Sequence, residues 1–180
     1  MSAEEVVEAY VRGKDDNRAD LAARAFADDA RLTVRNATTA VAFPAVTQGR
    51  DAIVDVLVTQ FGKQYANVRT FCLARPSPEV MSFSCDWLVG MTARDDASAR
   101  LGAGRYDWTL RATPQWRASE LVITIDAMEV LPPSLAPAIL RWTTRSLSYP
   151  WSSAGEVVDT APAIEQLAPV LARLQRDAGR

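Results

Sequence analysis

Histidine is absent from this 180-residue chain, and its absence excludes more chemistry than any other feature of the composition. A protein without imidazole cannot use Ser-His-Asp or Cys-His catalysis, histidine-ligated zinc, or a histidine acid or base. Lysine is scarce, since Lys14 and Lys63 are the only lysines among 20 basic residues. The two cysteines, Cys72 and Cys85, do not make a zinc site without histidine. We therefore expect no metal, and reduced thiols.

The sequence also lacks a strong net charge, a long apolar run and a glycine-rich phosphate loop. With 20 basic and 22 acidic residues the net charge is −2, which gives no electrostatic reason to expect a nucleic-acid partner. No apolar run reaches the roughly 18 residues of a membrane span, and residues 1–10 lack the order of a secretory signal. The excess of arginine over lysine is typical of a GC-rich bacterial genome. We expect a cytoplasmic protein without membrane contact or cofactor.

Three helices are expected in the first third of the chain. Ser2 and Glu5 form a capping-box pattern that begins the first helix, and Gly13 is its expected end. A second helix is predicted over 17–29 and a third over 50–61, from apolar residues at helical spacing. The paired acids in this region, Asp15-Asp16 among them, fall at predicted helix ends and turns, where we expect solvated carboxylates.

Beyond residue 62 the apolar period changes from helical to two. The clearest case is 80–93, where apolar and polar residues alternate as in a half-buried strand. Helices followed by consecutive strands with short turns are typical of an α+β fold with a mostly antiparallel sheet. The predicted strands are 31–35, 67–74, 80–93, 101–111 and 118–130.

Pro132-Pro133 ends this unit, so we expect an α+β domain over 1–131 and a helical C-terminal extension over 132–180. Within the extension, helices are predicted over 135–147 and 164–174. An apolar stripe on the last helix is expected to dock on the protein's own core. The stripe consists of Ile164, Leu167, Leu171 and Leu174.

Four short motifs, in a fixed order, carry a family resemblance. They are Phe26-Ala-Asp-Asp-Ala30, Gln48-Gly-Arg-Asp-Ala-Ile53, Gly104-Arg-Tyr-Asp107 and Trp116-Arg117. From about residue 3 to 130 the chain resembles the nuclear transport factor 2-like superfamily, which includes SnoaL-like polyketide cyclases, ketosteroid isomerases and scytalone dehydratases. The resemblance implies a cone-shaped fold with three N-terminal helices on a curved sheet. It also implies an apolar pocket between the layers, and frequent homodimers.

The ketosteroid isomerase pattern can be carried over residue by residue. Tyr10 precedes Phe26 by 16 residues, as does the tyrosine that donates to the oxyanion in that family. The family's general base falls on Val34, which cannot take a proton. In scytalone dehydratases a catalytic histidine stands about where this chain has Thr70. Tyr10 is therefore a candidate catalytic donor, and the alternative is a core tyrosine on a helix face.

Two carboxylates, those of Asp107 and Asp126, lie on predicted strands. Tyr106 and Trp108 define the apolar face of their strand, so alternation places Asp107 on the opposite, outer face. The limonene epoxide hydrolases of the superfamily have an Arg-x-Asp motif on one strand, and Arg105-Tyr106-Asp107 matches this motif in residue type alone. Asp126 shares a largely apolar face with its strand neighbours, and a buried carboxylate is costly unless it is paired. We take Asp126 as the catalytic base candidate; the alternative is an ion pair with an arginine.

Aromatic residues on apolar strand faces are usually core, but in this fold the core and the pocket wall are one surface. We therefore expect several of them to line the pocket, together with residues that share their faces. The expected ligand-binding residues are Trp87, Trp108, Tyr106, Phe83, Thr124, Met128 and Val34. Cys85 shares the face of Trp87 and is expected to be an inert buried thiol.

Two functions from different classes follow. The first is a cofactor-free isomerase, cyclase or dehydratase that acts on a cyclic or polyketide-like apolar molecule. The alternative is a non-catalytic ligand-binding or dimerisation domain of the same fold, which the missing base at Val34 favours. In either case we expect a homodimer through an outer sheet face. The patch expected for it comprises Ser82, Ser84, Asp86, Leu88, Ile123 and Ile125.

Overall fold

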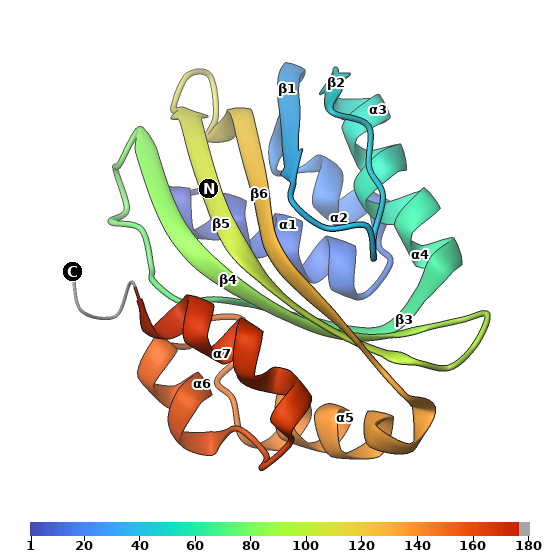
Figure 1. Cartoon of the computed structure of the whole chain (residues 1–180). Coiled ribbons are helices and arrows are strands. Elements are labelled where there is room, and N and C mark those ends of the chain that lie inside the picture. Colours follow the sequence, from blue (N-terminus) through green and yellow to red (C-terminus); the bar gives the residue numbers. More distant parts are fainter. Residues whose placement is uncertain (177–180) are drawn as a thin grey trace.

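The structure, a computed structural model, describes residues 1–176. It confirms an α+β fold: a six-stranded, strongly curved sheet lies between helices on both faces (Figure 1). The strand order is β2-β1-β6-β5-β4-β3, with β1 and β6 parallel and the other neighbours antiparallel. The strands are β1 Phe26–Asn36, β2 Val46–Gln48, β3 Tyr65–Cys72, β4 Ser82–Ala93, β5 Ala99–Arg111 and β6 Arg117–Leu131.

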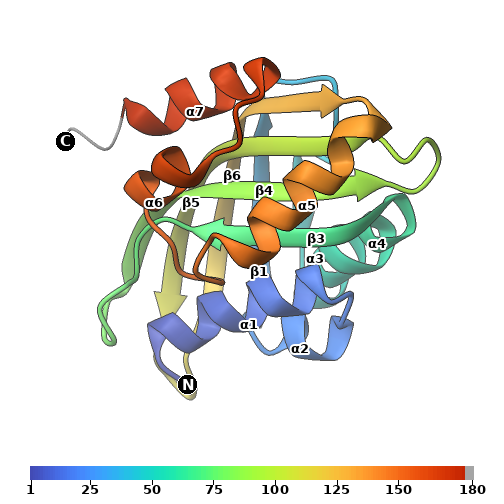
Figure 2. The same ribbon diagram turned by 90° about the horizontal axis from the view of Figure 1, so that it is seen from below.

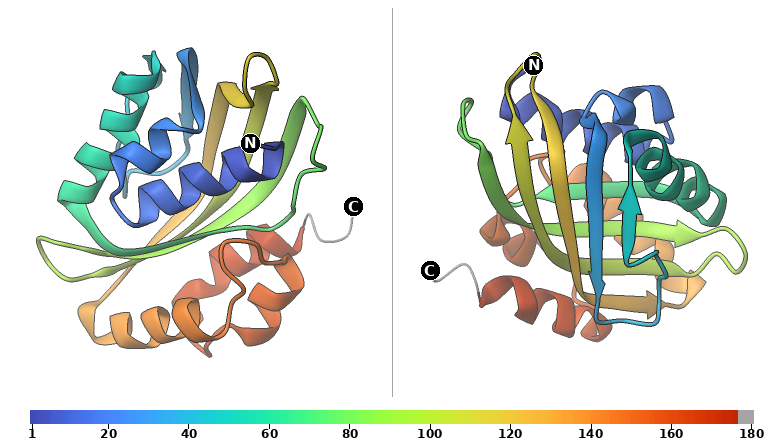
Figure 3. Two further views of the ribbon diagram at one scale, coloured as in Figure 1. Left: turned by 180° about the vertical axis from the view of Figure 1, so that it is seen from behind. Right: turned by 90° about the horizontal axis from the view of Figure 1, so that it is seen from above.

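The helices of the first third cover one face of the sheet, here called the inner face (Figure 3). The predicted capping box at Ser2 is present: Glu5 N–H donates to the serine hydroxyl, and the Ser2 N–H donates to the Glu5 carboxylate. These helices are α1 Ala3–Asp15, α2 Ala19–Ala23, and a continuous stretch of α3 Arg50–Val54, a π-helical segment Asp55–Gln60 and α4 Phe61–Gln64.

Two predicted helix ends in this region are wrong. Gly13 lies inside α1, because a Cβ there would come within 2.8 Å of Ala22 Cα on α2; the glycine permits close helix packing. The second helix ends at Ala23 rather than near residue 29, since the chain from Phe26 onward pairs with β6. Tertiary pairing therefore overrides the local helical spacing.

The C-terminal extension covers the opposite, outer face of the sheet (Figure 2). Its buried apolar residues form a second core with the outer residues of β4 and β5, such as Leu88 and Leu101. The predicted stripe docks on this core: Leu167 and Leu174 are fully buried, although Val170 rather than Leu171 lies between them. The elements are η2 Pro133–Leu135, α5 Ala136–Arg145, α6 Ala154–Thr160, η3 Glu165–Leu167 and α7 Ala168–Gln175. Helix α6 has no counterpart in the sequence prediction.

The extension covers part of the surface that we expected to mediate dimerisation. Leu88 is buried under it, and Asp86 is ion-paired with Arg173 of α7. Ile123 and Ile125 are on the inner face, so their assignment to an outer patch is wrong. Self-association through the remaining part of this face stays a prediction. Within residues 1–176, no helix is both long enough and apolar enough to span a membrane.

Candidate functional site

A small apolar cavity lies between the inner face of the sheet and the N-terminal helices. Its volume is about 50 Å³, and for comparison an engineered cavity of about 150 Å³ binds benzene. Residues of α1, β1, the loop after β1, the helix over 50–64 and all of β3–β6 contribute to its wall. The lining residues are Tyr10, Lys14, Val34, Val41, Phe43, Leu57, Phe61, Thr70, Trp87, Val89, Met91, Tyr106, Ile123, Ile125 and Met128.

Five of the residues named from the sequence lie at this cavity: Tyr10, Val34, Trp87, Tyr106 and Met128. The other three ligand-binding candidates do not line it. Trp108 is in the core behind it, with its ring 5.4 Å from the ring of Tyr10. Phe83 packs at the edge of the core, near the start of β4, and Thr124 lies on the outer face opposite Arg105.

Asp126 lies outside the cavity, and its expected place on the pocket face is wrong. The register between β5 and β6 shifts here: Ala103 is opposite Ala127 but Gly104 is opposite Ile125, so Asp126 is the extra residue of a β-bulge. The bulge breaks the alternation and separates Asp126 from Met128. The Asp126 carboxylate instead accepts a hydrogen bond of 2.6 Å from Arg173 of α7.

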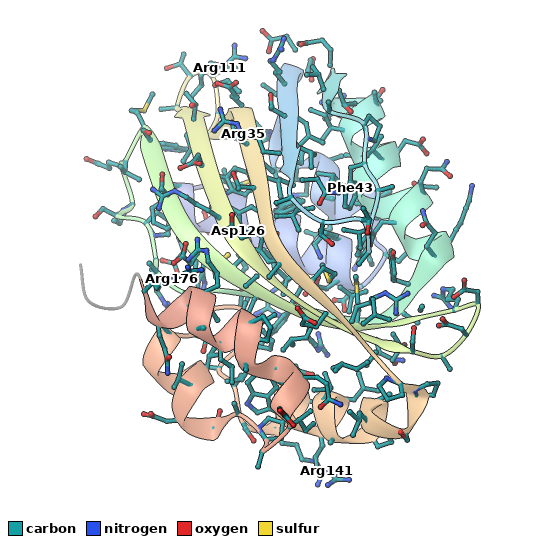
Figure 4. All side chains as sticks on the ribbon, in the orientation of Figure 1. Arg35, Phe43, Arg111, Asp126, Arg141 and Arg176 are labelled. Carbon is teal, nitrogen blue, oxygen red and sulfur yellow. The ribbon has the colours of Figure 1, made fainter. Side chains whose placement is uncertain are left out.

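The ion pair with an arginine, which was the alternative interpretation of Asp126, is therefore present. Arg173 is 12% exposed and bridges Asp126 and Asp86, so α7 is held on the outer face by charge as well as by apolar contacts. In Figure 4 Asp126 lies on the strands above α7, whereas Phe43 lies on the loop beside α3 and α4. Asp107 is also on the outer face, where its carboxylate accepts from Ser84 and Arg105.

We expect Asp126→Asn to lower the free energy of unfolding by about 1 kcal/mol, since it removes one charge from a partly exposed pair. Ligand binding in the cavity should not change, because Asp126 faces α7. Urea denaturation measures the stability. Asp107→Asn is the matched control, since its pair with Arg105 is more exposed and should contribute less. A loss of ligand affinity in folded Asp126→Asn would contradict this assignment.

The polar end of the cavity is built around Lys14, one of the two lysines. Its side chain is 7% exposed, and its Nζ lies 5.1 Å from the ring centroid of Phe61. The ammonium donates to Asp15 Oδ1 and to Thr70 Oγ1, each at 2.7 Å. Two of its three N–H groups are thus used by these bonds.

Asp15 lies behind Lys14 and is the acceptor at the centre of this group. Besides Lys14, its Oδ1 accepts from the Thr70 hydroxyl at 2.8 Å, and its Oδ2 accepts from the Thr70 backbone N–H at 2.6 Å. The Tyr149 hydroxyl donates to Oδ2 at 3.1 Å. Four donors therefore hold a carboxylate whose side chain is 0% exposed. Asp15 orients Lys14 and Thr70, and it has little capacity left to accept a further proton donor.

This group of polar side chains was not predicted from the sequence. We expected the Asp15-Asp16 pair to be solvated at a helix end, and that is wrong for Asp15 because the extension and β3 cover it. The available signal was the spacing of Tyr10 and Lys14. Residues four apart share one helix face, and that face carries the candidate donor Tyr10.

Two tyrosine hydroxyls extend the polar end. The rings of Tyr10 and Tyr106 contact each other edge to face, with ring centroids 5.8 Å apart. Burial is the main cause that raises the pKa of each above the ordinary tyrosine value, and the negative charge of Asp15 adds to it. Both hydroxyls therefore stay protonated at neutral pH and act as hydrogen-bond donors rather than bases.

Comparison with known proteins reveals similar folds at low sequence identity. No family model matches the chain, and no curated protein matches its sequence. Among solved structures, a hexachlorocyclohexane dehydrochlorinase (LinA) of type 2 superposes with a TM-score of 0.59 at 16% identity, over 72% of this chain and 86% of the other. A nuclear transport factor 2-like superfamily protein from Salmonella enterica gives 0.55 at 18% identity, over 69% and 88%.

The chain has the nuclear transport factor 2-like fold. A hypothetical protein from Catenulispora acidiphila, described as having a ketosteroid isomerase-like fold and crystallised with trimethylamine, gives a TM-score of 0.53 at 12% identity, over 68% of this chain and 85% of that one. Structural similarity at such low sequence identity shows the fold alone. The chemistry of the site depends on the side chains that this chain places there.

Within the nuclear transport factor 2-like fold, the wall of this cavity offers several hydrogen-bond donors and few hydrogen-bond acceptors. Val34 lines the cavity at the position where the resemblance places a general base. No carboxylate among residues 1–176 lines it directly, and no cluster of three or more potential metal-ligating side chains occurs in the same residues. A hydrogen bond with Cys85, and after it burial, raises the pKa of the Cys72 thiol, so this thiol is not activated.

Proposed function

We propose that the protein binds a small, mostly apolar molecule with one acceptor oxygen, and that Lys14 is the group that binds this oxygen. The observation that carries the proposal is the buried Lys14–Asp15–Thr70 group at the wall of an otherwise apolar cavity. Burying such a pair is costly, and apolar residues of the same volume are often as stable or more stable. A charged donor in this position is therefore better explained by a ligand than by stability.

The cavity sets the size of this ligand. A space of about 50 Å³ is too small for a steroid-like or polyketide-like ring system. Met91 and Met128 are in the wall, and methionine side chains adapt readily to a guest. The proposed ligand is therefore a single small ring or a short chain, which the cavity accepts when the side chains of Met91 and Met128 move aside.

The chemistry that the donors support is proton transfer next to a carbonyl. Lys14 and the hydroxyls of Tyr10 and Tyr106 would stabilise negative charge that develops on the ligand oxygen. No carboxylate among residues 1–176 lines the cavity, so a water molecule would take the α-proton and leave an enolate whose oxygen these donors hold. In isomerisation the enolate would regain a proton from water at another carbon, and in elimination it would expel an anionic leaving group from the β-carbon. The likeness to a dehydrochlorinase is compatible with such chemistry in this fold.

A second candidate is binding without turnover. The observation that favours it is the saturated hydrogen bonding of Asp15, which leaves the cavity without a free base. Proton exchange distinguishes the two. In D2O an enzyme of this kind should accelerate exchange of the α-protons of cyclopentanone, observed by NMR, and Lys14→Met should abolish the acceleration. A pure binding protein leaves the exchange at the buffer rate.

We expect cyclopentanone to bind about tenfold more tightly than methylenecyclopentane, which has the same shape without the acceptor oxygen. A hydrogen bond from a charged donor contributes about 1.5–3 kcal/mol, and 1.4 kcal/mol corresponds to tenfold in affinity. Lys14→Met should remove the difference. Quenching of Trp87 emission measures binding, with Trp87→Phe as the control for its origin. Equal affinities in the wild type would refute the role of Lys14.

A further inference from the structure

The C-terminal extension reaches the polar end of the cavity through one short segment, residues 149–152. This segment runs along the free edge of β3: Cys72 N–H donates to Pro150 O at 2.8 Å, and Ser152 N–H donates to Cys72 O at 3.0 Å. The edge strand is thereby covered. The pairing brings Tyr149 next to the β3 residues that contact Asp15.

The side chain of Tyr149 is held on several sides. Two guanidinium groups lie over its ring, with Arg12 Cζ at 5.0 Å and Arg69 Cζ at 4.6 Å from the centroid. The Phe71 and Tyr149 rings form a T-shaped pair, with centroids 5.8 Å apart and an interplanar angle of 85°. Each cation–π contact contributes about 0.5–2 kcal/mol. The ring therefore has one orientation, and in this orientation its hydroxyl points to Asp15 Oδ2.

We propose that Tyr149 is a positioning residue of the candidate site, whose hydroxyl fixes the Asp15 carboxylate and through it the Lys14 ammonium and the Thr70 hydroxyl. The C-terminal extension is then a necessary part of the site on the inner face, although its helices pack on the outer face. Desolvation first, and then the charge of Asp15, raises the pKa of Tyr149, so its hydroxyl remains a donor throughout the neutral range.

The geometry explains why one hydrogen bond matters. Oδ1 of Asp15 is occupied by Lys14 and Thr70, and Oδ2 by the Thr70 N–H and Tyr149. Without the Tyr149 donor, Oδ2 keeps only the backbone N–H, and the carboxylate is free to rotate toward its remaining donors. The rotation moves the acceptor that holds Lys14. The steric volume of the ring plays no part in this effect.

The small number of lysines makes a direct test practical. In protein labelled with 13Cε-lysine, two lysine signals are expected, and Lys63→Arg identifies that of Lys14. Tyr149→Phe keeps the ring in contact with the two arginines and removes only the hydroxyl. We expect it to shift the Lys14 signal and leave the Lys63 signal unchanged. An unchanged Lys14 signal in folded Tyr149→Phe overturns the proposal.

Thr160→Val is the matched control. It removes a 2.9 Å hydrogen bond from Trp142 within the same extension, and it should leave both lysine signals in place. A shift of Lys14 as large as that in Tyr149→Phe would mean that any disturbance of the extension acts on Lys14, which also overturns the proposal.

Should Tyr149→Phe not fold, Arg69→Met loosens the Tyr149 ring and keeps its hydroxyl. It should shift the Lys14 signal in the same way, and no shift in it contradicts the proposal.

Ligand affinity gives a second readout, which rests on the proposed function. We expect Tyr149→Phe to weaken cyclopentanone binding about fivefold, the equivalent of one ordinary hydrogen bond, and to leave methylenecyclopentane binding unchanged. The lysine signals need no ligand. Wild-type protein that binds neither compound would therefore count against the proposed function alone, whereas the Lys14 signal still decides on Tyr149.

Discussion

Asp15→Ala should lower the free energy of unfolding by about 3–5 kcal/mol, because it leaves the buried ammonium of Lys14 without its counter-charge. The side chains of Lys14 and Asp15 are 7% and 0% exposed, so water cannot replace the lost carboxylate. The Thr70 and Tyr149 donors lose their acceptor as well. Urea denaturation measures the change, with the slope of the transition as a check that the unfolded state is the same.

Two variants serve as references for this result. Asp16→Ala removes the neighbouring acid, which is 56% exposed and 3.8 Å from Arg69, and should cost well under 1 kcal/mol. The double variant Lys14→Met with Asp15→Leu removes both charges and should be more stable than Asp15→Ala alone. If the double variant were the less stable, the charge of Lys14 would not be the cause.

Gly104→Ala should cost about 3 kcal/mol, an effect of similar size. Gly104 lies opposite the bulge at Asp126. A Cβ at this position would overlap the carbonyl oxygen of Thr124 on β6 and come within 2.7 Å of Trp87 Cζ2. Trp87 is packed on Tyr106 and cannot move away freely, so the backbones of β5 and β6 must separate. Such overpacking typically costs 1–3 kcal/mol, and more when backbone atoms are involved.

Gly155→Ala provides the comparison, since a Cβ there has no heavy atom nearer than Ser153 Oγ at 3.8 Å. In helix α6 this substitution should be neutral or stabilise the protein by up to about 1 kcal/mol. Thermal unfolding of the two variants separates the steric effect from the general effect of replacing glycine. If Gly104→Ala melted like the wild type, Gly104 would not be required by the bulge.

Much of the fold was predictable because it depends on local pattern. The capping box at Ser2 begins α1 as expected, and the alternation of β4 places Trp87 on the inner face and Asp86 on the outer face, as observed. The resemblance, carried by short motifs, gave the correct fold. It also placed Tyr10 and Val34, which both line the cavity. Alternation and capping act over a few residues, so a sequence contains them in full.

The sequence by itself therefore determined the α+β class, most of the elements, the inner face of β4 and the absence of any imidazole chemistry. The tertiary structure alone decided where the two most important carboxylates, those of Asp126 and Asp15, are placed. Asp126 shares the outer face with Thr124, and a bulge opposite Gly104 resets the alternation of β6 so that Met128 lines the cavity whereas Asp126 does not. Asp15 is buried because Thr70 and Tyr149, 55 and 134 residues away in the chain, converge on it. A bulge depends on the neighbouring strand, and the burial of a charge depends on partners distant in sequence, so no local pattern specifies either.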